Sequence, residues 1–564
     1  MNYMDRYSYW CEAGLPADVQ AELASVKNDI EELKGRFGCD LQFGTAGMRG
    51  IMGAGSNRLN RYTVRRAAQG MAAWLAGTDL PQKAAIGYDS RHNSKLFAEV
   101  CAVAFAEKGI RTYLYDRLAP TPMLSYAVRE LGCGCGIVIS ASHNAGAYNG
   151  VKCYGPDGCQ MTDEPAAVVT AKIAEIPYFI PEKKDFETYM HEGVISYITQ
   201  GLWEKYYETV LREAVDPDMI RSAGLNIVYT PLCGTGNEPV REILGRLGVS
   251  IAVVECQEKP DGDFKTCEYP NPETDAALKE SYKVADKVPC DVILGTDPDA
   301  DRVAIAVPCD GGYKKLSGNE LGCLLLDYIL KARKAQNNIP EGAIAVRSIV
   351  SSPLADQVAK KYGVEMKAVL TGFKYIGGEI LELEQKGEEN KFIFGFEESC
   401  GYLKGTYARD KDAIVASMLV CELAASLKLE DKNILDALND LYAEYGYYLA
   451  YVQSMELTGA DAMEKAAKMM ADLREAVPST IGGVQVTAVR DYRASTHTDM
   501  LTGNVSPILL PKSNVLEFLL GENGSVIARP SGTEPKVKFY YTAVAGDQAA
   551  AKDLLDAMVK QMSL

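Results

Sequence analysis

The sequence predicts an α/β protein, with three similar α/β domains followed by a smaller α+β C-terminal domain. Beyond residue 55, helical patterns alternate regularly with short apolar runs, and this alternation is typical of α/β folds. The chain has 564 residues, too many for one hydrophobic core, so roughly three to five domains are expected. The last block lacks the alternation: strand-like runs such as KVKFYYTAV and terminal helices indicate a different domain type.

The first element is predicted to be one amphipathic helix over residues 17–36. Its apolar residues recur at helical spacing, at Leu23, Val26, Ile30 and Leu33. A glycine-dense segment, residues 43–55, follows this helix.

The alternating region then supplies the predicted strands. Short apolar runs predict strands at 84–89, 110–116, 135–140, 225–230, 250–255, 291–296, 343–350 and 391–396. Early helical patterns end at Gly77, Gly109 and Gly132, where we expect left-handed glycine caps. A further helix is predicted over 320–334. Breaks in the pattern place domain boundaries so that α/β domains cover 1–199, 200–315 and 316–445, and the α+β domain covers 446–564.

The composition limits the class of function. Lys+Arg number 59 against 76 Asp+Glu, a net charge of −17, which argues against a nucleic-acid partner but allows a phosphorylated metabolite in a locally basic cleft. The fifteen cysteines form no C-x-x-C pair, so a zinc site is disfavoured and a reducing cytosol is favoured. The N-terminus lacks a signal-peptide pattern and no stretch predicts a membrane span. We therefore expect a cytoplasmic protein without membrane association.

The stretch Gly136–Asn144 places a serine directly after a predicted strand. Loops at strand ends commonly carry chemistry in α/β proteins, so Ser142 is either a turn cap or a nucleophile that carries phosphate. His143 is the one of the four histidines that adjoins this serine. The absence of a G-x-S-x-G pattern disfavours a hydrolase triad.

A second candidate site follows the strand 291–296. Asp297, Asp299 and Asp301 alternate, so in an extended backbone their carboxylates would project to one side and require a cation. Oxygen ligands favour Mg²⁺ or Ca²⁺. An EF-hand is excluded because Arg302 and Pro308 occupy its glycine and glutamate positions. The alternative is a solvated acidic turn.

A third candidate is the turn Arg529–Pro535. Arg529, Ser531 and Thr533, with the backbone freed by Gly532, offer the donors of a phosphate-binding turn, although Ser-Gly-Thr is also ordinary turn chemistry. The glycine-rich segment with Arg49 is similar and lacks the Gly-Lys-Ser/Thr of a P-loop.

A fourth candidate lies at the end of the strand 391–396. Glu397 and Ser399 could bind sugar hydroxyls, or the loop could carry exposed carboxylates without a ligand. Taken together, a strand-end serine, a carboxylate cluster for Mg²⁺ and a separate phosphate turn favour phosphoryl transfer between serine and substrate. Arg302 would add a second cation at the phosphoryl group.

Four ordered motifs carry a resemblance to a known family: SASHN (140–144), DPDADR (297–302), GFEES (395–399) and RPSGTEP (529–535). With these motifs the chain resembles the α-D-phosphohexomutase superfamily (phosphoglucomutase/phosphomannomutase), in the longer subgroup that includes phosphopentomutases. The resemblance implies four domains around a central cleft. Two departures stand out: Ala145 replaces a usual proline, and Pro298 and Ala300 replace the usual glycines of the metal loop, which should stiffen it.

The resemblance also implies roles for individual residues. Ser142 would be the phosphoserine, and its phosphate would bind one Mg²⁺ together with Asp297, Asp299 and Asp301. Substrate would bind through Arg49, Glu397, Ser399, Arg529, Ser531, Gly532 and Thr533. Proton transfer is implied for Lys152 or Lys411, with His143 as the alternative beside the serine.

The implied function is an isomerase of carbohydrate metabolism. It would interconvert α-D-glucose 1-phosphate and glucose 6-phosphate through a phosphoserine enzyme, with glucose 1,6-bisphosphate as bound intermediate and activator. Phosphopentomutase and phosphomannomutase activities stay open, as does a non-catalytic sugar-phosphate-binding regulator. The expected partners are small sugar phosphates, not nucleic acid or membrane, in a monomer or small homo-oligomer.

Overall fold

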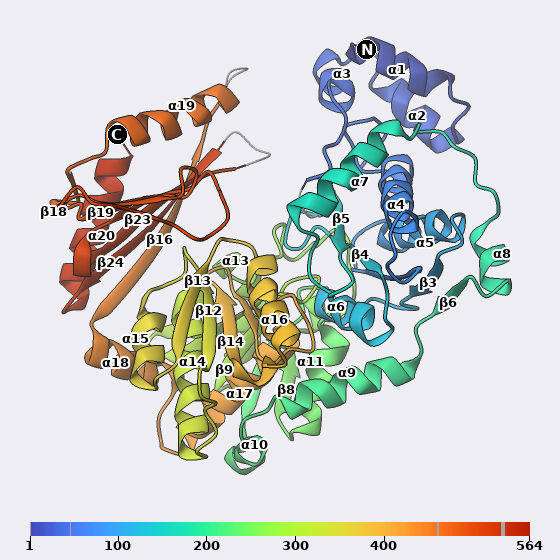
Figure 1. The fold of residues 1–564 in the computed structure, drawn as a ribbon. Helices are drawn as coiled ribbons and strands as arrows, with labels where there is room; N and C mark the ends of the chain where they lie inside the picture. The colour runs from blue at the N-terminus through green and yellow to red at the C-terminus, as the bar shows by residue number, and fades with distance from the viewer. Residues whose placement is uncertain (1, 45–46, 459–461, 532–535, 564) are drawn as a thin grey trace. The chain divides into compact units, whose positions relative to one another are not determined.

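The computed structural model describes residues 2–44, 47–458, 462–531 and 536–563 (Figure 1). Contacts divide the chain into two compact units. Unit 1 comprises Met1–Ser317, Ile376–Gly395 and Ser399–Asp431, and unit 2 comprises Gly318–Tyr375, Phe396–Glu398 and Lys432–Leu564.

The N-terminal segment consists of short helices: α1 (Tyr3–Glu12), α2 (Ala17–Ser25) and α3 (Ile30–Phe37). The prediction of one helix over 17–36 is therefore wrong. Helix α2 ends at Ser25 and α3 starts afresh after Asp29, whose carboxylate accepts hydrogen bonds from the backbone N–H groups of Glu31 and Glu32. A carboxylate that satisfies the first N–H groups of a helix defines a new helix start.

The first sheet has the strand order β1-β5-β4-β2-β3-β6, and β4, β2, β3 and β6 run parallel. Its strands are β1 (Gly47–Ile51), β2 (Lys83–Tyr88), β3 (Arg111–Leu114), β4 (Cys135–Ile139), β5 (Tyr148–Tyr154) and β6 (Ile195–Tyr197). Its helices are α4 (Arg61–Ala76), α5 (Ser94–Ala106), α6 (Thr121–Glu130), α7 (Asp163–Glu175) and α8 (Phe186–His191).

The predicted glycine caps of this region divide in two. Gly109 and Gly132 have φ values of 76° and 58°, as expected for left-handed caps. Gly77 has a φ of −92°, so that prediction is wrong. Helix α4 ends instead by tightening, because the N–H groups of Gly77 and Thr78 donate to carbonyls three residues earlier.

The second sheet has the order β11-β10-β9-β7-β8, with β9, β7 and β8 parallel. Its strands are β7 (Asn226–Thr230), β8 (Ser250–Val253), β9 (Val292–Thr296), β10 (Val303–Cys309) and β11 (Gly312–Lys315). The accompanying helices are α9 (Gln200–Arg212), α10 (Pro217–Ala223), α11 (Asn237–Arg246), α12 (Glu255–Glu258) and α13 (Asp275–Ala285).

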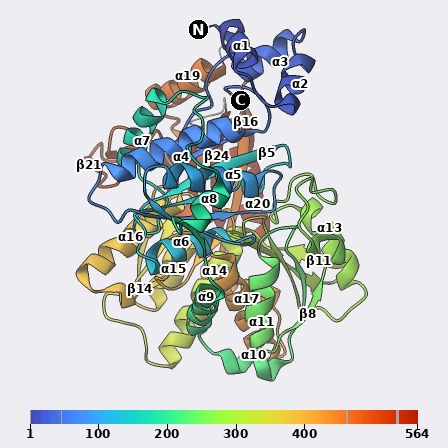
Figure 2. The same ribbon diagram turned by 90° about the vertical axis from the view of Figure 1, so that its right-hand side faces the viewer.

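The third sheet has the order β13-β12-β14-β15. Its strands are β12 (Ile344–Ser348), β13 (Glu365–Val369), β14 (Phe392–Glu397) and β15 (Gly401–Leu403). The helices of this region are α14 (Gly318–Ala335), α15 (Leu354–Lys361), α16 (Phe373–Lys386), α17 (Ala413–Lys428) and α18 (Ile434–Tyr445). Helix α17 is buried along nearly its whole length, in contact with α9 and α11 (Figure 2), because its residues are apolar on every side.

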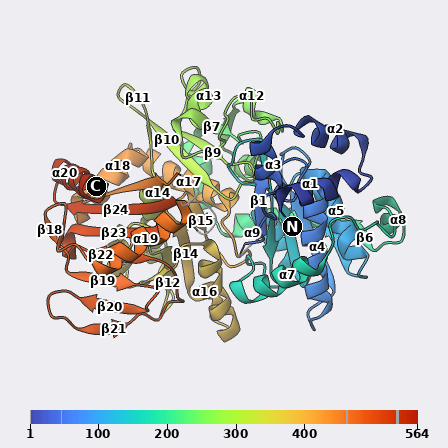
Figure 3. The same ribbon diagram turned by 90° about the horizontal axis from the view of Figure 1, so that it is seen from above.

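The fourth sheet is antiparallel, with the order β16-β24-β23-β22-β19-β20-β21 (Figure 3). Its strands are β16 (Tyr447–Glu456), β19 (Ala488–Asp491), β20 (Thr496–Asp499), β21 (Val505–Pro507), β22 (Leu516–Leu519), β23 (Gly524–Pro530) and β24 (Lys536–Ala545). A small hairpin, β17 (Thr480–Ile481) and β18 (Val484–Gln485), forms a separate two-stranded sheet and contributes Ile481 to the same apolar core. Side chains of α19 (Ala462–Glu475) and α20 (Gln548–Met562) complete its apolar core.

The predicted strands are confirmed, since each of the eight apolar runs overlaps one to within a few residues at each end. The all-antiparallel last sheet explains why the regular helix–strand alternation ends there. Within the described part of the chain, no helix has both the length and the apolar composition to cross a bilayer.

Candidate active site

The serine loop, residues 140–148, connects β4 to β5. Ser142 is buried and has a φ of 51°, in the left-handed region that residues other than glycine seldom adopt. Its backbone N–H donates to the hydroxyl of Ser140 at 2.8 Å. The strand end therefore presents Ser142 in a strained conformation of the kind that clusters at functional sites.

The aspartate turn, residues 297–302, follows β9 directly. The expected extended backbone is wrong: the N–H of Ala300 donates to the carbonyl of Asp297 at 3.0 Å, and Ala300 has a φ of 51°. One carboxylate oxygen of Asp297 also accepts the N–H groups of Asp301 and Arg302, both at 3.1 Å. A tight turn thus brings oxygens of Asp297, Asp299 and Asp301 within 4.8 Å of one another.

The serine loop and the aspartate turn meet in unit 1. The hydroxyl of Ser142 donates to Asp297 Oδ2 at 2.8 Å, and His143 Nδ1 lies 3.2 Å from the same hydroxyl. Burial, reinforced by the positive charge of Arg302, holds the pKa of His143 well below its usual range. The imidazole beside the serine is therefore neutral near pH 7.

The carboxylate cluster fits a hard divalent cation. All three aspartates are buried, and among the described residues Asp299 Oδ1 and Asp301 Oδ1 have no hydrogen-bond partner. Burial, together with the charges of Asp299 and Asp301, raises the pKa of Asp297 well above its usual range. An ion with oxygen ligands, such as Mg²⁺, would relieve this repulsion and satisfy the orphaned oxygens.

Two lysines lie against the same cluster. Lys152 Nζ is 2.5 Å from Asp299 Oδ2 and 3.2 Å from Asp301 Oδ2. Lys411 Nζ is 2.9 Å from Asp410 and 3.3 Å from Asp301. Burial would lower the pKa of Lys152, but the carboxylates of Asp299 and Asp301 outweigh burial and raise it. Lys152 is therefore protonated and offsets part of the cluster's negative charge.

The two predicted arginines of unit 1 contact other groups. Arg302 pairs with Glu273 at 3.3 Å, and its Nε lies 3.8 Å from Asp301 Oδ1. Arg49 lies on β1 and donates to the side chain of Asn144 in the serine loop at 2.9 Å. Arg302 thus lies beside the aspartate turn, and Arg49 lies beside the serine loop.

Unit 2 contains most of the predicted sugar and phosphate ligands. Glu397 is buried at the end of β14 and accepts the N–H of Gly372 at 2.7 Å. Arg529 ends β23, and the N–H of Ser531 donates to the carbonyl of Lys536 at 2.8 Å. Gly532 and Thr533 lie outside the described residues. Ser399, two residues after Glu397, belongs to unit 1.

Tyr540 connects the sugar and phosphate residues within unit 2. Burial, together with the nearby charge of Glu398, raises the pKa of Tyr540 to about 12, while Arg529 acts in the opposite direction through a side-chain hydrogen bond. The phenol therefore lies between the loop that carries Glu397 and the strand that carries Arg529.

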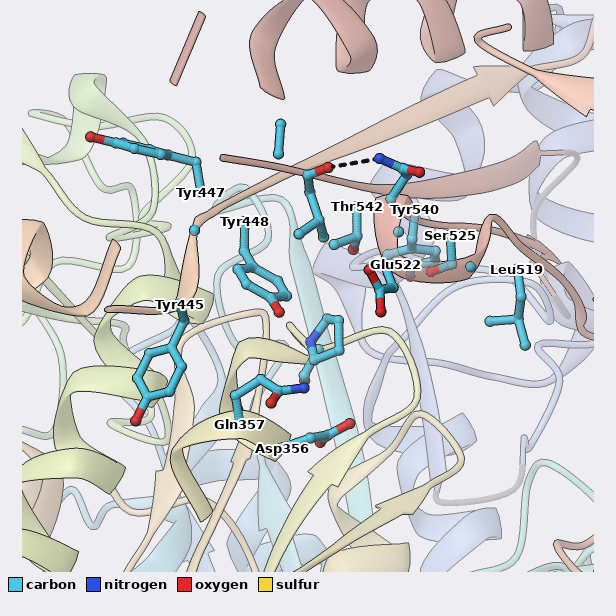
Figure 4. Close-up of a pocket in the computed structure, with 18 of the residues that line it drawn as sticks. Asp356, Gln357, Tyr445, Tyr447, Tyr448, Leu519, Glu522, Ser525, Tyr540 and Thr542 are labelled. Carbon is cyan, nitrogen blue, oxygen red and sulfur yellow. Dashed lines mark hydrogen bonds between the residues drawn. The ribbon is translucent and has the colours of Figure 1, made fainter. Parts of the chain in front are cut away.

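A large cavity of about 1260 Å³ also lies in unit 2 (Figure 4). Asp356, Gln357, Tyr448 and Glu522 surround it, and Tyr540 is a lining residue that it shares with the sugar and phosphate region. Among the described residues of unit 2, Glu397, Arg529 and Ser531 do not line it. The cavity is therefore distinct from these three predicted ligands.

Four models of the family described as phosphoglucomutase/phosphomannomutase match the chain in sequence. The α/β/α domains I, II and III match residues 40–178, 204–311 and 317–445, and the C-terminal domain matches 459–561. The chain belongs to the phosphoglucomutase/phosphomannomutase family. The predicted resemblance and the four-domain α/β architecture are thereby confirmed.

Curated relatives agree with this family assignment. A phosphoglucomutase of Staphylococcus epidermidis is 37% identical over 512 residues, 90% of this chain and 92% of the relative. A phosphoglucomutase of Staphylococcus aureus is 36% identical over 540 residues, 94% of this chain and 95% of the relative.

Solved structures show the same fold. A putative phosphomannomutase from Thermus thermophilus covers 93% of this chain and 100% of its own, with a TM-score of 0.69 and 22% identity. The open form of Paramecium parafusin, a phosphoglucomutase, covers 93% of this chain and 94% of its own, with a TM-score of 0.70 and 17% identity.

Several contact residues of this family member were missed by sequence reasoning. Thr121, at the start of α6, donates to Asp299 Oδ2 at 2.7 Å, and Asp410 holds Lys411. Arg91 follows β2 and donates to backbone carbonyls of the serine loop. The residue types alone do not indicate a role at the site for any of these three residues. The one available signal is that Arg91, like Ser142, lies just after a predicted strand.

The geometry predicts a metal-dependent effect of Lys152→Met. The change removes one cation from three buried carboxylates and should lower the free energy of unfolding by about 3 kcal/mol in EDTA, because breaking a buried ion pair leaves uncompensated charge. Added Mg²⁺ should restore much of this loss. Urea unfolding with and without Mg²⁺ measures both quantities.

Lys205→Met is the matched control for that experiment. Lys205 pairs with Glu130 at 2.6 Å on the surface, so its removal should change stability by less than about 1 kcal/mol, with no dependence on Mg²⁺. Equal, Mg²⁺-independent losses in the two variants would contradict the assignment of Lys152 to the cluster.

Proposed function

We propose that this family member is a phosphoglucomutase that interconverts α-D-glucose 1-phosphate and glucose 6-phosphate. The observation that carries the proposal is the hydrogen bond from the strained Ser142 to Asp297 of the buried carboxylate cluster. Relatives called phosphoglucomutase, 35–37% identical over most of the chain, support the same activity. The enzyme is an isomerase that acts by intramolecular phosphoryl transfer.

The cluster is proposed to hold one Mg²⁺ through Asp297, Asp299, Asp301 and the phosphorylated Ser142. When bound, the ion supplies positive charge that offsets the negative charge of the transferring phosphoryl group. Three carboxylates with two unpartnered buried oxygens support this assignment.

Residues of the chain carry out the phosphoryl transfer and the accompanying proton transfers. Phosphorylated Ser142 gives its phosphoryl group to a hydroxyl of the bound hexose monophosphate, which forms glucose 1,6-bisphosphate. The attacking hydroxyl loses a proton and the serine oxygen gains one. Neutral His143, at 3.2 Å from Ser142 Oγ, and the amines of Lys152 and Lys411 are the proposed proton carriers.

The bound bisphosphate reorients in the site and returns its other phosphate to Ser142. This exchange needs a second phosphate site, which we assign to Arg529, Ser531, Gly532 and Thr533. Arg302 would add a second cation at the phosphoryl group on Ser142, and Arg49 would bind substrate. Glu397 and Ser399 are assigned to the sugar hydroxyls. Released bisphosphate would act as activator by phosphorylating Ser142.

We further propose domains at 1–199, 200–315, 316–445 and 446–564, a cytoplasmic location, and a monomer or small homo-oligomer. Phosphomannomutase is the alternative activity favoured by the family description itself, and phosphopentomutase is the next.

Mass and activity measurements test this function directly. Intact-mass analysis should show protein heavier by about 80 Da, the mass of one phosphoryl group, located at Ser142 by peptide mapping. Coupled assays with glucose, mannose and ribose 1-phosphates should rank glucose first. If mannose or ribose 1-phosphate were the best substrate, the protein would be reassigned as a phosphomannomutase or a phosphopentomutase. Inactivity of phosphorylated protein on all three would favour the non-catalytic regulator.

A further inference from the structure

We propose that Arg91 is the positioning residue that fixes the backbone of the serine loop for phosphoryl transfer. The inference rests on the proposed function and adds to it a buried arginine that the sequence patterns did not single out. The observation behind the proposal is that the guanidinium group of Arg91 binds four backbone carbonyls of the loop that carries Ser142.

The contacts of Arg91 cover most of the loop. Nη2 donates to the carbonyls of Ser142 and Asn144, both at 2.5 Å, and Nη1 donates to those of Ala145 at 2.9 Å and Tyr148 at 3.0 Å. The side chain of Arg91 has no exposed surface. A planar guanidinium presents several N–H donors in fixed directions, so it can order several carbonyls at once.

Other groups hold the guanidinium itself in place. Asp89 lies 3.3 Å from Arg91 Nε, and its other oxygen accepts the N–H of Arg91 at 2.9 Å and the hydroxyl of Ser94 at 2.8 Å. The ring of Phe264 lies 5.0 Å from the guanidinium. Arg91 lies three residues after the end of β2 at Tyr88, and β2 pairs with β4, the strand that leads into the serine loop. The same sheet therefore positions both Arg91 and the loop that it binds.

The loop needs such a group. It contains Gly146 and no proline, and it keeps Ser142 at a φ of 51°, which is unfavourable for a residue with a Cβ. Four carbonyl oxygens that point toward one spot would repel one another without a cation among them. Arg91 supplies that cation and so keeps the Ser142 hydroxyl 2.8 Å from Asp297.

Arg91→Lys is the first test, because it keeps the charge and replaces two donor nitrogens with one. We expect kcat to fall by about 10²-fold, since small misplacements of reacting groups have effects of this size, while KM for glucose 1-phosphate stays within about threefold. Arg91→Ala should lose more, and added guanidinium chloride at low millimolar concentration should restore part of its kcat. Backbone amide exchange in peptides spanning 140–149 should accelerate in both variants.

Arg65→Lys is the matched control. Arg65 is 5% exposed and pairs with Glu107 at 2.7 Å in the same domain, without contact to the serine loop. This variant should lose stability but keep wild-type kcat per folded molecule and wild-type exchange over 140–149. A kcat of Arg91→Lys equal to that of Arg65→Lys would overturn the proposal.

The outcomes separate the inference from the function on which it rests. An active, phosphorylated wild type with an equally active Arg91→Lys contradicts only the role of Arg91. An inactive wild type contradicts the proposed function, and unchanged amide exchange in Arg91→Lys would still overturn the loop-positioning role by itself.

Discussion

Replacing Ser142 with alanine is expected to lower phosphoglucomutase turnover by at least about 10⁴-fold, because the change removes the atom proposed to carry the phosphoryl group. The fold should survive, since alanine keeps the backbone of the serine loop and the four carbonyls that Arg91 binds. The measurements are the coupled assay with saturating bisphosphate and intact mass, in which the gain of about 80 Da should be absent.

Ser125→Ala is the control for the loss of a buried serine hydroxyl. Ser125 is fully buried, donates to the carbonyl of Gly158 and accepts the N–H of Arg409. Its removal should cost about 1–3 kcal/mol of stability and leave the phosphoserine in place. Turnover by Ser142→Ala at the level of Ser125→Ala would exclude Ser142 as phosphoryl carrier.

Replacing Asp299 with asparagine is expected to lower kcat by about 10³-fold, because one of three metal-facing carboxylates is lost while the side-chain volume is kept. The size of the stability change depends on the metal. In EDTA the variant should differ little from wild type, because two effects oppose each other: the pairing with Lys152 Nζ at 2.5 Å is lost, and one repelling charge is gone from a cluster whose oxygens lie within 4.8 Å.

With Mg²⁺ the stability difference should widen in favour of the wild type. Wild type should gain about 2.7 kcal/mol at a free Mg²⁺ concentration 100 times its Kd, and the variant much less at the same concentration. Thermal unfolding across a Mg²⁺ titration measures this without reference to activity. Asp327→Asn is the control: Asp327 accepts the Tyr362 hydroxyl at 2.9 Å, and its loss should leave the Mg²⁺ dependence unchanged. A wild-type Mg²⁺ response in Asp299→Asn would contradict the metal assignment.

Local patterns were sufficient for the strands and for the candidate motifs. The apolar runs that end at Ile139 and Thr296 are buried strands, and Ser142 and Asp297 follow them directly. Apolar runs and strand-end turns are local features, so a sequence displays them without knowledge of the partners. The wrong prediction of one helix over 17–36 also has a local cause. Asp29 starts a new helix, and this signal, although visible in the sequence, was overlooked.

The fold class, the family and the candidate residues for the phosphoserine and the metal site follow from the amino-acid sequence alone. The arrangement of these candidates in space, and the charges around them, follow from the tertiary structure. Ser142 meets Asp297 across 155 positions, and Lys152 meets Asp299 across 147. The pairing of Arg91 with the serine loop is likewise invisible in a linear pattern, because an arginine after a strand has no preferred partner until parallel strands place two loops at the same sheet edge.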